Sequence, residues 1–178
     1  MVARTGLLGR PLAGVHRMLG EWPAEEAAAH YEDELKQVFP ARHLPRFDLV
    51  LLGLGVDGHV ASIFPGSPGL TDREHWVLPT EFYDGTRRLT VTLPVLAAAR
   101  SLLFLVSGKS KAEAVRQVLS KDKHTGDQPM PARILLDMVS ISKKAGWERP
   151  SVTWVLDRDA ASLLPARSSR LDGEAAPR

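Results

Sequence analysis

A glycine-rich segment with one carboxylate and one imidazole is the part of this sequence best equipped for chemistry. It reads Gly53-Leu54-Gly55-Val56-Asp57-Gly58-His59 and directly follows an apolar run. Asp57 and His59 flank Gly58, so the carboxylate can orient the imidazole and raise its basicity, as a general base requires. The glycines allow positive φ and a close approach of the backbone to a ligand. A structural alternative stays open, in which Asp57 caps a following helix and His59 is a polar surface residue.

The same glycines also fit the G-x-G-x-x-G pattern of dinucleotide-binding loops. Such a site needs a long helix packed on the glycine turn, whereas residues 60–64 run straight into Pro65, Gly66 and Pro68. No second strand that ends in an acidic residue follows at the expected distance. We therefore reject a dinucleotide site.

Basic residues after a second apolar run form another candidate, Ser107-Gly108-Lys109-Ser110-Lys111. A nucleotide P-loop would need a glycine five residues before Gly108, and the sequence has leucine there. Backbone N–H groups at a helix N-terminus, with the two lysines beside them, could still hold a phosphate or carboxylate. Two solvated lysines in a first helical turn are an equal alternative. Arg88, with Arg87, could face an anionic ligand, although such residues are more often solvated.

Other kinds of catalytic site find little support in the sequence. There is no cysteine, which excludes disulfides, thiolate zinc sites and cysteine nucleophiles. The remaining histidines show no paired metal-ligand spacing, and Ser62 does not stand in the G-x-S-x-G pattern of serine hydrolases. We expect neither a metal nor a cofactor.

Strands and helices must alternate along the chain to position these segments. The apolar runs 47–52, 102–106 and 152–156 predict strands, the first two buried on both faces as in parallel sheets. Residues 89–93 alternate as a half-buried strand that Pro94 ends. Helical periodicity covers 23–38 and 110–119, and a capped helix is expected at 157–164. Residues 136–150 give no clear prediction.

This order predicts an α/β fold with three layers, in which helices flank a largely parallel sheet. Ligands of such sheets bind beyond the carboxyl ends of the strands, where both candidate segments lie. We expect one domain over residues 1–164 and a disordered polar tail at 165–178. A formal net charge of +2 gives no argument for nucleic acid. No apolar run is long enough to span a bilayer and no signal peptide is visible, so a cytoplasmic enzyme is expected.

Several collinear blocks resemble the 6-phosphogluconolactonase family, which lies within the broader glucosamine/galactosamine-6-phosphate isomerase-like fold group. The strongest block is residues 47–66, followed by residues 88–96. Shorter matches are Ser107-Gly108, Lys111-Ala112, Pro131-Ala132, Trp154, Asp157 and, upstream, Glu25 to Ala28 with Tyr31. Together these blocks cover most of residues 15–164.

The resemblance implies hydrolysis of 6-phospho-D-glucono-1,5-lactone to 6-phosphogluconate in the oxidative pentose phosphate pathway, without metal or cofactor. It implies His59 as the general base that activates water, with Asp57 orienting it. It also implies substrate binding by Gly55 and Gly58 of the glycine loop and by the basic residues Arg88 and Lys111. The expected partner is a small phosphorylated sugar lactone, with neither nucleic acid nor membrane. A monomer is expected for the complete family member.

The sequence departs from the family pattern in three places. The family's first strand with its Ser-Gly-Gly phosphate loop, and its later Asp-Glu-Arg motif, have no counterpart, so we expect an N-terminally truncated member. Val56 stands where relatives often have an acidic residue, and residues 134–150 contain extra sequence. Two alternatives therefore stay open: an amino-sugar phosphate deaminase or isomerase, which has a related Asp-Gly-His turn, and a non-catalytic truncated paralogue.

Overall fold

The computed structural model describes residues 14–40, 43–81, 85–120, 129–141 and 150–165. The elements in chain order are α1 (Ala24–Val38), β1 (Val50–Leu52), η3 (Pro68–Leu70), β2 (Val77–Glu81), β3 (Arg87–Val91), α2 (Leu93–Ala97), β4 (Ser101–Val106), η4 (Lys109–Lys111), α3 (Ala112–Leu119), α4 (Pro131–Ile141) and β5 (Ser151–Leu156). The expected tail, apart from Pro165, lies outside the described residues, as do residues 142–149. No helix in the described part of the chain is long and apolar enough to cross a membrane.

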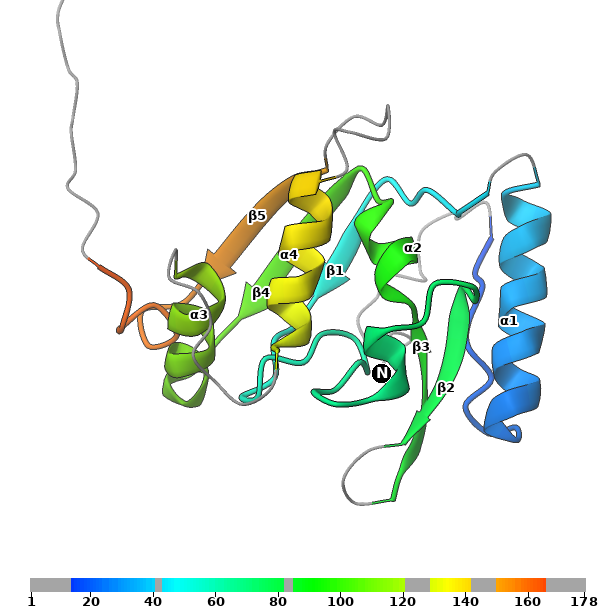
Figure 1. Ribbon diagram of the computed structural model, residues 1–178, viewed down its shortest axis with the longest axis horizontal. Helices are drawn as coiled ribbons and strands as arrows, with labels where there is room; N and C mark the ends of the chain where they lie inside the picture. The colour runs from blue at the N-terminus through cyan, green and yellow to red at the C-terminus, as the bar shows by residue number, and fades with distance from the viewer. Residues whose placement is uncertain (1–13, 41–42, 82–84, 121–128, 142–149, 166–178) are drawn as a thin grey trace, which may run out of the picture.

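Three parallel strands form the main sheet, in the order β1-β4-β5 (Figure 1). Val50 pairs with Leu102, and Ser101 pairs with Ser151. All three strands were predicted from their apolar runs, although β1 is shorter than the run 47–52. The α/β class, with helices flanking a parallel sheet, is confirmed.

One face of this sheet carries the main core. Leu52, Leu102 and Phe104 are buried there against residues of α2, α3 and α4, which lie on the same side of the sheet (Figure 1). Phe104 stacks on Trp154 of β5 with ring centroids 4.0 Å apart. The alternate residues point the other way, and Leu51, Leu105 and Val155 are 59%, 49% and 51% exposed. The strands therefore alternate between a buried and an open face in the described part of the chain, and the prediction that the first two are buried on both faces is wrong.

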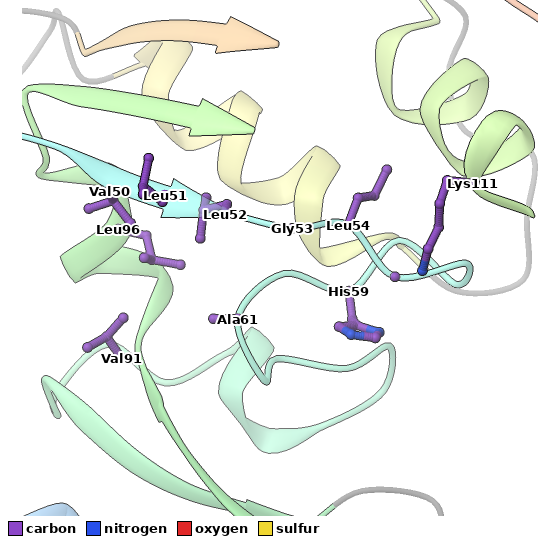
Figure 2. A pocket seen from close by; sticks show the side chains of 11 residues that line it. Val50, Leu51, Leu52, Gly53, Leu54, His59, Ala61, Val91, Leu96 and Lys111 are labelled. Carbon is purple, nitrogen blue, oxygen red and sulfur yellow. The ribbon is translucent and has the colours of Figure 1, made fainter. Parts of the chain in front are cut away.

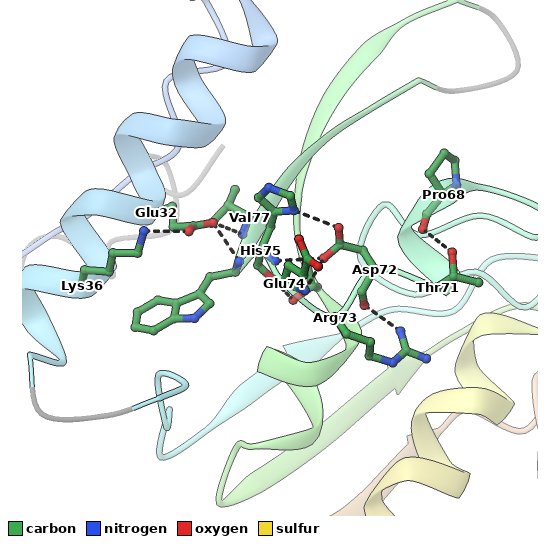
Figure 3. A network of polar contacts seen from close by, with 11 residues as sticks. Glu32, Lys36, Pro68, Thr71, Asp72, Arg73, Glu74, His75 and Val77 are labelled. Carbon is green, nitrogen blue, oxygen red and sulfur yellow. Dashed lines mark hydrogen bonds and ion pairs between the residues drawn. The ribbon is translucent and has the colours of Figure 1, made fainter.

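A second, smaller core lies between α1 and the antiparallel hairpin of β2 and β3. Ala28 and Leu35 of α1 pack there with Trp76 and Val77. The carboxylate of Glu32 ties the helix to the hairpin, because it accepts the N–H groups of Trp76 at 2.8 Å and Val77 at 3.1 Å (Figure 3).

Two predictions of local structure are wrong. Residues 157–164 form consecutive turns instead of a helix, although Asp157 does cap them by accepting the N–H of Ala160 at 2.7 Å. The strand expected at 89–93 ends at Val91, and Leu93-Pro94 begin α2 because proline suits a first helical turn. Within this strand the buried side chain is Thr90, while its apolar neighbours are only partly buried.

Candidate functional site

The loop after β1 brings Asp57 and His59 into contact. Asp57 Oδ1 lies 2.6 Å from His59 Nδ1 and also accepts the His59 backbone N–H at 3.1 Å. Both side chains are about a quarter exposed, at 24% and 27%. The imidazole packs on Phe64, with ring centroids 4.7 Å apart. No helix begins at this turn, so Asp57 accepts the N–H of its own turn instead of capping a helix. Its carboxylate contacts the imidazole at Nδ1, which leaves Nε2 for other partners.

The glycines of this loop make room for the Asp57–His59 pair. A Cβ on Gly55 would lie 2.0 Å from His59 Nδ1 and 2.4 Å from Asp57 Oδ1. Gly58 has φ 78°, and a Cβ there would lie 2.4 Å from Met130 Cε. Their N–H groups bond within the loop, to the carbonyl oxygens of His59 at 2.9 Å and Gly55 at 3.1 Å. Gly55 and Gly58 therefore shape the loop, and their N–H groups are engaged within it.

A cavity of about 360 Å³ opens beside this loop (Figure 2). Its walls come from the edge of β1 with the glycine loop, from the hairpin, and from α2. The lining residues are 50–55, His59, Ala61, Val91, Leu96 and Lys111. His59 and Lys111 are the ionisable side chains among them, so a mostly apolar wall surrounds one imidazole and one ammonium. Such a cavity suits a small anionic ligand.

Within the segment 107–111, the Lys111 side chain and the Gly108 backbone N–H have different surroundings. Figure 2 shows the Lys111 side chain extending from the start of α3 toward the glycine loop. Gly108, with φ 95°, donates its N–H to Asp157 Oδ2 at 2.9 Å. A carboxylate of the protein thus already occupies this amide of the expected anion site. The ammonium of Lys111 is the part of the segment 107–111 that reaches the cavity.

Arg88 is not among the described residues that line the cavity. It lies exposed on β3 opposite Thr80 of β2, and Val91 is the residue of that strand that contacts the cavity. Ala61, Val91 and Leu96 were not expected in the site, because apolar residues from separate elements give no signal in the sequence. Ala61 is unusual in having φ 51°.

A second aspartate–histidine pair lies outside this cavity. Asp72 Oδ2 is 2.9 Å from His75 Nδ1 in the loop before β2 (Figure 3). The hydrogen bond and charge of Asp72 raise the pKa of His75. Burial alone would raise the pKa of Asp72, but hydrogen bonds from the His75 side chain and the loop amides outweigh it and lower that pKa. Neither residue lines the cavity.

Comparisons with known proteins point to one family. The family model described as "Glucosamine-6-phosphate isomerases/6-phosphogluconolactonase" matches residues 2–147. Human 6-phosphogluconolactonase is 38% identical over an alignment of 168 residues, with coverage of 90% of this chain and 59% of the human protein. The Synechocystis protein of the same name is 37% identical over 86% of this chain and 60% of its own length. The chain thus spans about half to three fifths of the length of the curated relatives it matches, from 47% to 60%.

Solved structures agree with this result. The crystal structure of 6-phosphogluconolactonase from Leishmania guyanensis superposes with a TM-score of 0.65 at 35% identity, over 79% of this chain and 53% of that one. A monomeric glucosamine-6-phosphate deaminase superposes with a TM-score of 0.53 at 28% identity, over 78% and 54% of the two chains.

Proposed function

Because this chain belongs to the glucosamine-6-phosphate isomerase/6-phosphogluconolactonase family, we propose that it hydrolyses 6-phospho-D-glucono-1,5-lactone to 6-phosphogluconate in the oxidative pentose phosphate pathway. The observation that carries the proposal is the Asp57–His59 pair beside a cavity that also contains Lys111. The relatives named 6-phosphogluconolactonase support the choice of substrate.

His59 acts as the general base of the reaction. With Nδ1–H donated to Asp57, the lone pair of Nε2 is left to accept a proton from water. The water oxygen then bonds to the lactone carbonyl carbon and forms a tetrahedral oxyanion. When the bond from this carbon to the ring oxygen breaks, the imidazolium returns its proton to that oxygen. The lactone becomes an acid and an alcohol, and no redox partner or group acceptor is consumed.

Asp57 contributes to this step through His59. Its carboxylate fixes the tautomer and the plane of the ring, and it stabilises the imidazolium that forms. Gly55 and Gly58 support the site by making room for the pair.

Lys111 docks the anionic part of the substrate. Its ammonium is a point charge that attracts phosphate or carboxylate without a strict geometry. Arg88 lies away from the cavity lining, so we assign it at most a role in attracting the anion at longer range.

The proposal also covers the setting of the enzyme. We propose a cytoplasmic enzyme that uses neither metal nor cofactor and in which residues 1–164 form part of the lactonase domain. The complete family member acts as a monomer. Its partner is the phosphorylated sugar lactone, and nucleic acid and membrane have no part in the reaction.

The test compares two histidines in the intact protein. His59→Ala should lower kcat for lactone opening by roughly a hundredfold or more, the usual contribution of a positioned base, with little change in KM. His75→Ala is the matched control, because His75 pairs with Asp72 in the same way but outside the cavity. Near-unchanged turnover in His59→Ala would contradict the role of His59.

The same preparation distinguishes the alternative reactions. Release of ammonia from glucosamine 6-phosphate faster than lactone opening would favour a deaminase. A protein that binds the phosphorylated sugar and accelerates neither reaction would be a non-catalytic relative.

A further inference from the structure

The turn that follows His59 has an unfavourable backbone conformation. Ala61 has φ 51°, the one positive φ outside glycine among the described residues. The N–H of Ile63 bonds to the carbonyl of Val60 at 2.9 Å and closes the turn around Ala61. A left-handed alanine persists only where its surroundings hold it in place. Because Ala61 lines the cavity together with His59, this conformation is part of the site.

A buried hydroxyl holds this turn. Thr90 of β3 is 3% exposed, and its Oγ1 accepts the N–H of Ser62 at 3.2 Å. The hydroxyl proton is donated to the carbonyl of Val91 at 3.0 Å, so the oxygen is oriented toward the turn. Val60 and Ile63, on either side, are almost fully buried. The turn thus has two apolar anchors and one polar anchor, and the polar one comes from a strand far away in the sequence.

We propose that Thr90 is a positioning residue for His59. It fixes Ser62, and through Ser62 the left-handed Ala61 and the backbone that leads back to His59. The other end of the same segment is fixed by Phe64, whose ring contacts the imidazole and whose N–H bonds to Ser67 Oγ at 3.2 Å. This inference rests on the proposed function, because it assigns Thr90 to the geometry of the proposed base.

The first test separates positioning from stability with a matched pair of variants. Thr90→Val keeps the shape and removes the hydroxyl, leaving the part-buried Ser62 N–H without its acceptor. Thr92→Val removes an equally buried hydroxyl two residues along, one that donates to the carbonyl of His75 at 2.8 Å and not to the site. Thr90→Ser retains the hydroxyl.

For lactone opening we expect Thr90→Val to lower kcat roughly tenfold or more with KM nearly unchanged, since small displacements of a catalytic group reduce turnover strongly. Thr90→Ser should recover most of the lost rate. Thr92→Val should keep kcat within about twofold of the parent, even if its melting temperature falls as much as that of Thr90→Val. Equal loss of kcat in Thr90→Val and Thr92→Val would overturn the proposal.

A second readout does not depend on turnover. The proton shared by His59 Nδ1 and Asp57 should give a downfield NMR resonance, and the Ser62 amide should exchange slowly with solvent. Thr90→Val should move the resonance and accelerate the exchange, whereas Thr90→Ser and Thr92→Val should leave both in place. If the parent opens no lactone and these shifts still occur, the lactonase assignment fails while the positioning role stands. If Thr90→Val leaves both signals unchanged, the positioning role is wrong, whatever the turnover.

Discussion

Lys111 presents a single positive charge to the cavity from η4, the turn that directly precedes α3. An ammonium attracts an anion about equally in the ground state and the transition state, which is uniform binding. We therefore expect Lys111→Ala to raise KM roughly tenfold with kcat changed less than about threefold. Steady-state kinetics at several salt concentrations would measure this effect. Lys109→Ala is the control, since Lys109 is exposed in the same turn but does not line the cavity. A loss confined to kcat would count against a docking role.

Position 55 must be glycine, because the side chains of His59 and Asp57 occupy the space that a Cβ would need. In Gly55→Ala the methyl group would meet His59 and Asp57 at distances that no real contact reaches. We expect the pair to separate and lactone opening to fall roughly a hundredfold, as for loss of the base itself. Gly69→Ala is the control, because its new methyl group would meet Ile63 at an ordinary 3.5 Å. Kinetics of both variants would decide, and full activity in Gly55→Ala would show that the pair is dispensable.

Between α1 and the β2–β3 hairpin, the Glu32 carboxylate is the main polar connection. Burial alone would raise the pKa of Glu32, but hydrogen bonds from Lys36, Trp76 and Val77 outweigh it and lower the pKa below its ordinary 4.5. A lowered folded-state pKa means that this stabilisation is complete above about pH 4.5 and is lost as the pH falls through the folded value. Thermal melts between about pH 2.5 and 7 should show this loss.

Glu32→Gln is the variant that isolates this effect. It keeps an oxygen acceptor but cannot ionise, so the free energy of unfolding should fall by about 1 kcal/mol near neutral pH and depend less on pH in the acid range. Asp33→Asn, a neighbouring exposed carboxylate on the same helix, is the control. An acid-range pH dependence as steep as that of the parent would contradict the assignment to Glu32.

Helices and strands could be predicted from the sequence wherever the hydrophobic pattern was strong. The runs behind β1, β4 and β5 and the periodicity of α1 and α3 were sufficient to predict these elements. The helix α4 was not predicted, although its buried residues Ala132, Leu135 and Val139 stand at helical spacing, because further apolar residues at 134, 136 and 138 obscure that spacing. Its position depends on contacts with α2 and α3. The segment β2 was missed because Pro79 interrupts it, which is tolerated here at a sheet edge.

The site was only partly predictable for the same reason. Asp57 and His59 are two residues apart, so their contact could be inferred from spacing alone. The alternation of residues 89–93 predicted a half-buried strand but no role for Thr90, because a buried threonine cannot be distinguished from an exposed one without its hydrogen-bond partner. That partner, Ser62, is 28 residues away.

On the scale of the whole molecule, the open face of the main sheet dominates the expected behaviour in solution. Leu105 and Val155 expose apolar surface side by side, and Leu51 exposes more on the neighbouring strand β1. One edge of β1 has no partner strand among the described residues. Such surfaces favour association. We expect residues 1–178, expressed alone, to self-associate at micromolar concentration. Analytical ultracentrifugation over a concentration series would measure the association.

Leu105 of β4 and Val155 of β5 are register neighbours, so charged substitutions at both positions test whether this face causes the association. Leu105→Lys with Val155→Glu should reduce association while leaving the far-ultraviolet circular dichroism unchanged. Val38→Lys replaces a similarly exposed apolar residue on α1 and should have little effect. A parent chain that sediments as a monodisperse monomer over the whole concentration series would contradict the expectation.

The pairing register of the main sheet also sets the order in which the molecule can fold. Val50 meets Leu102 and Ser101 meets Ser151, so each parallel pairing closes a loop of about fifty residues. The hairpin pairs Glu81 with Arg87 and closes almost at once. We therefore expect the hairpin to form early. The docking of α1, where Glu32 meets Trp76 over 44 residues, and the parallel sheet should form slowly. The loop that carries His59 begins where β1 ends, so it becomes ordered only in that last, slow step.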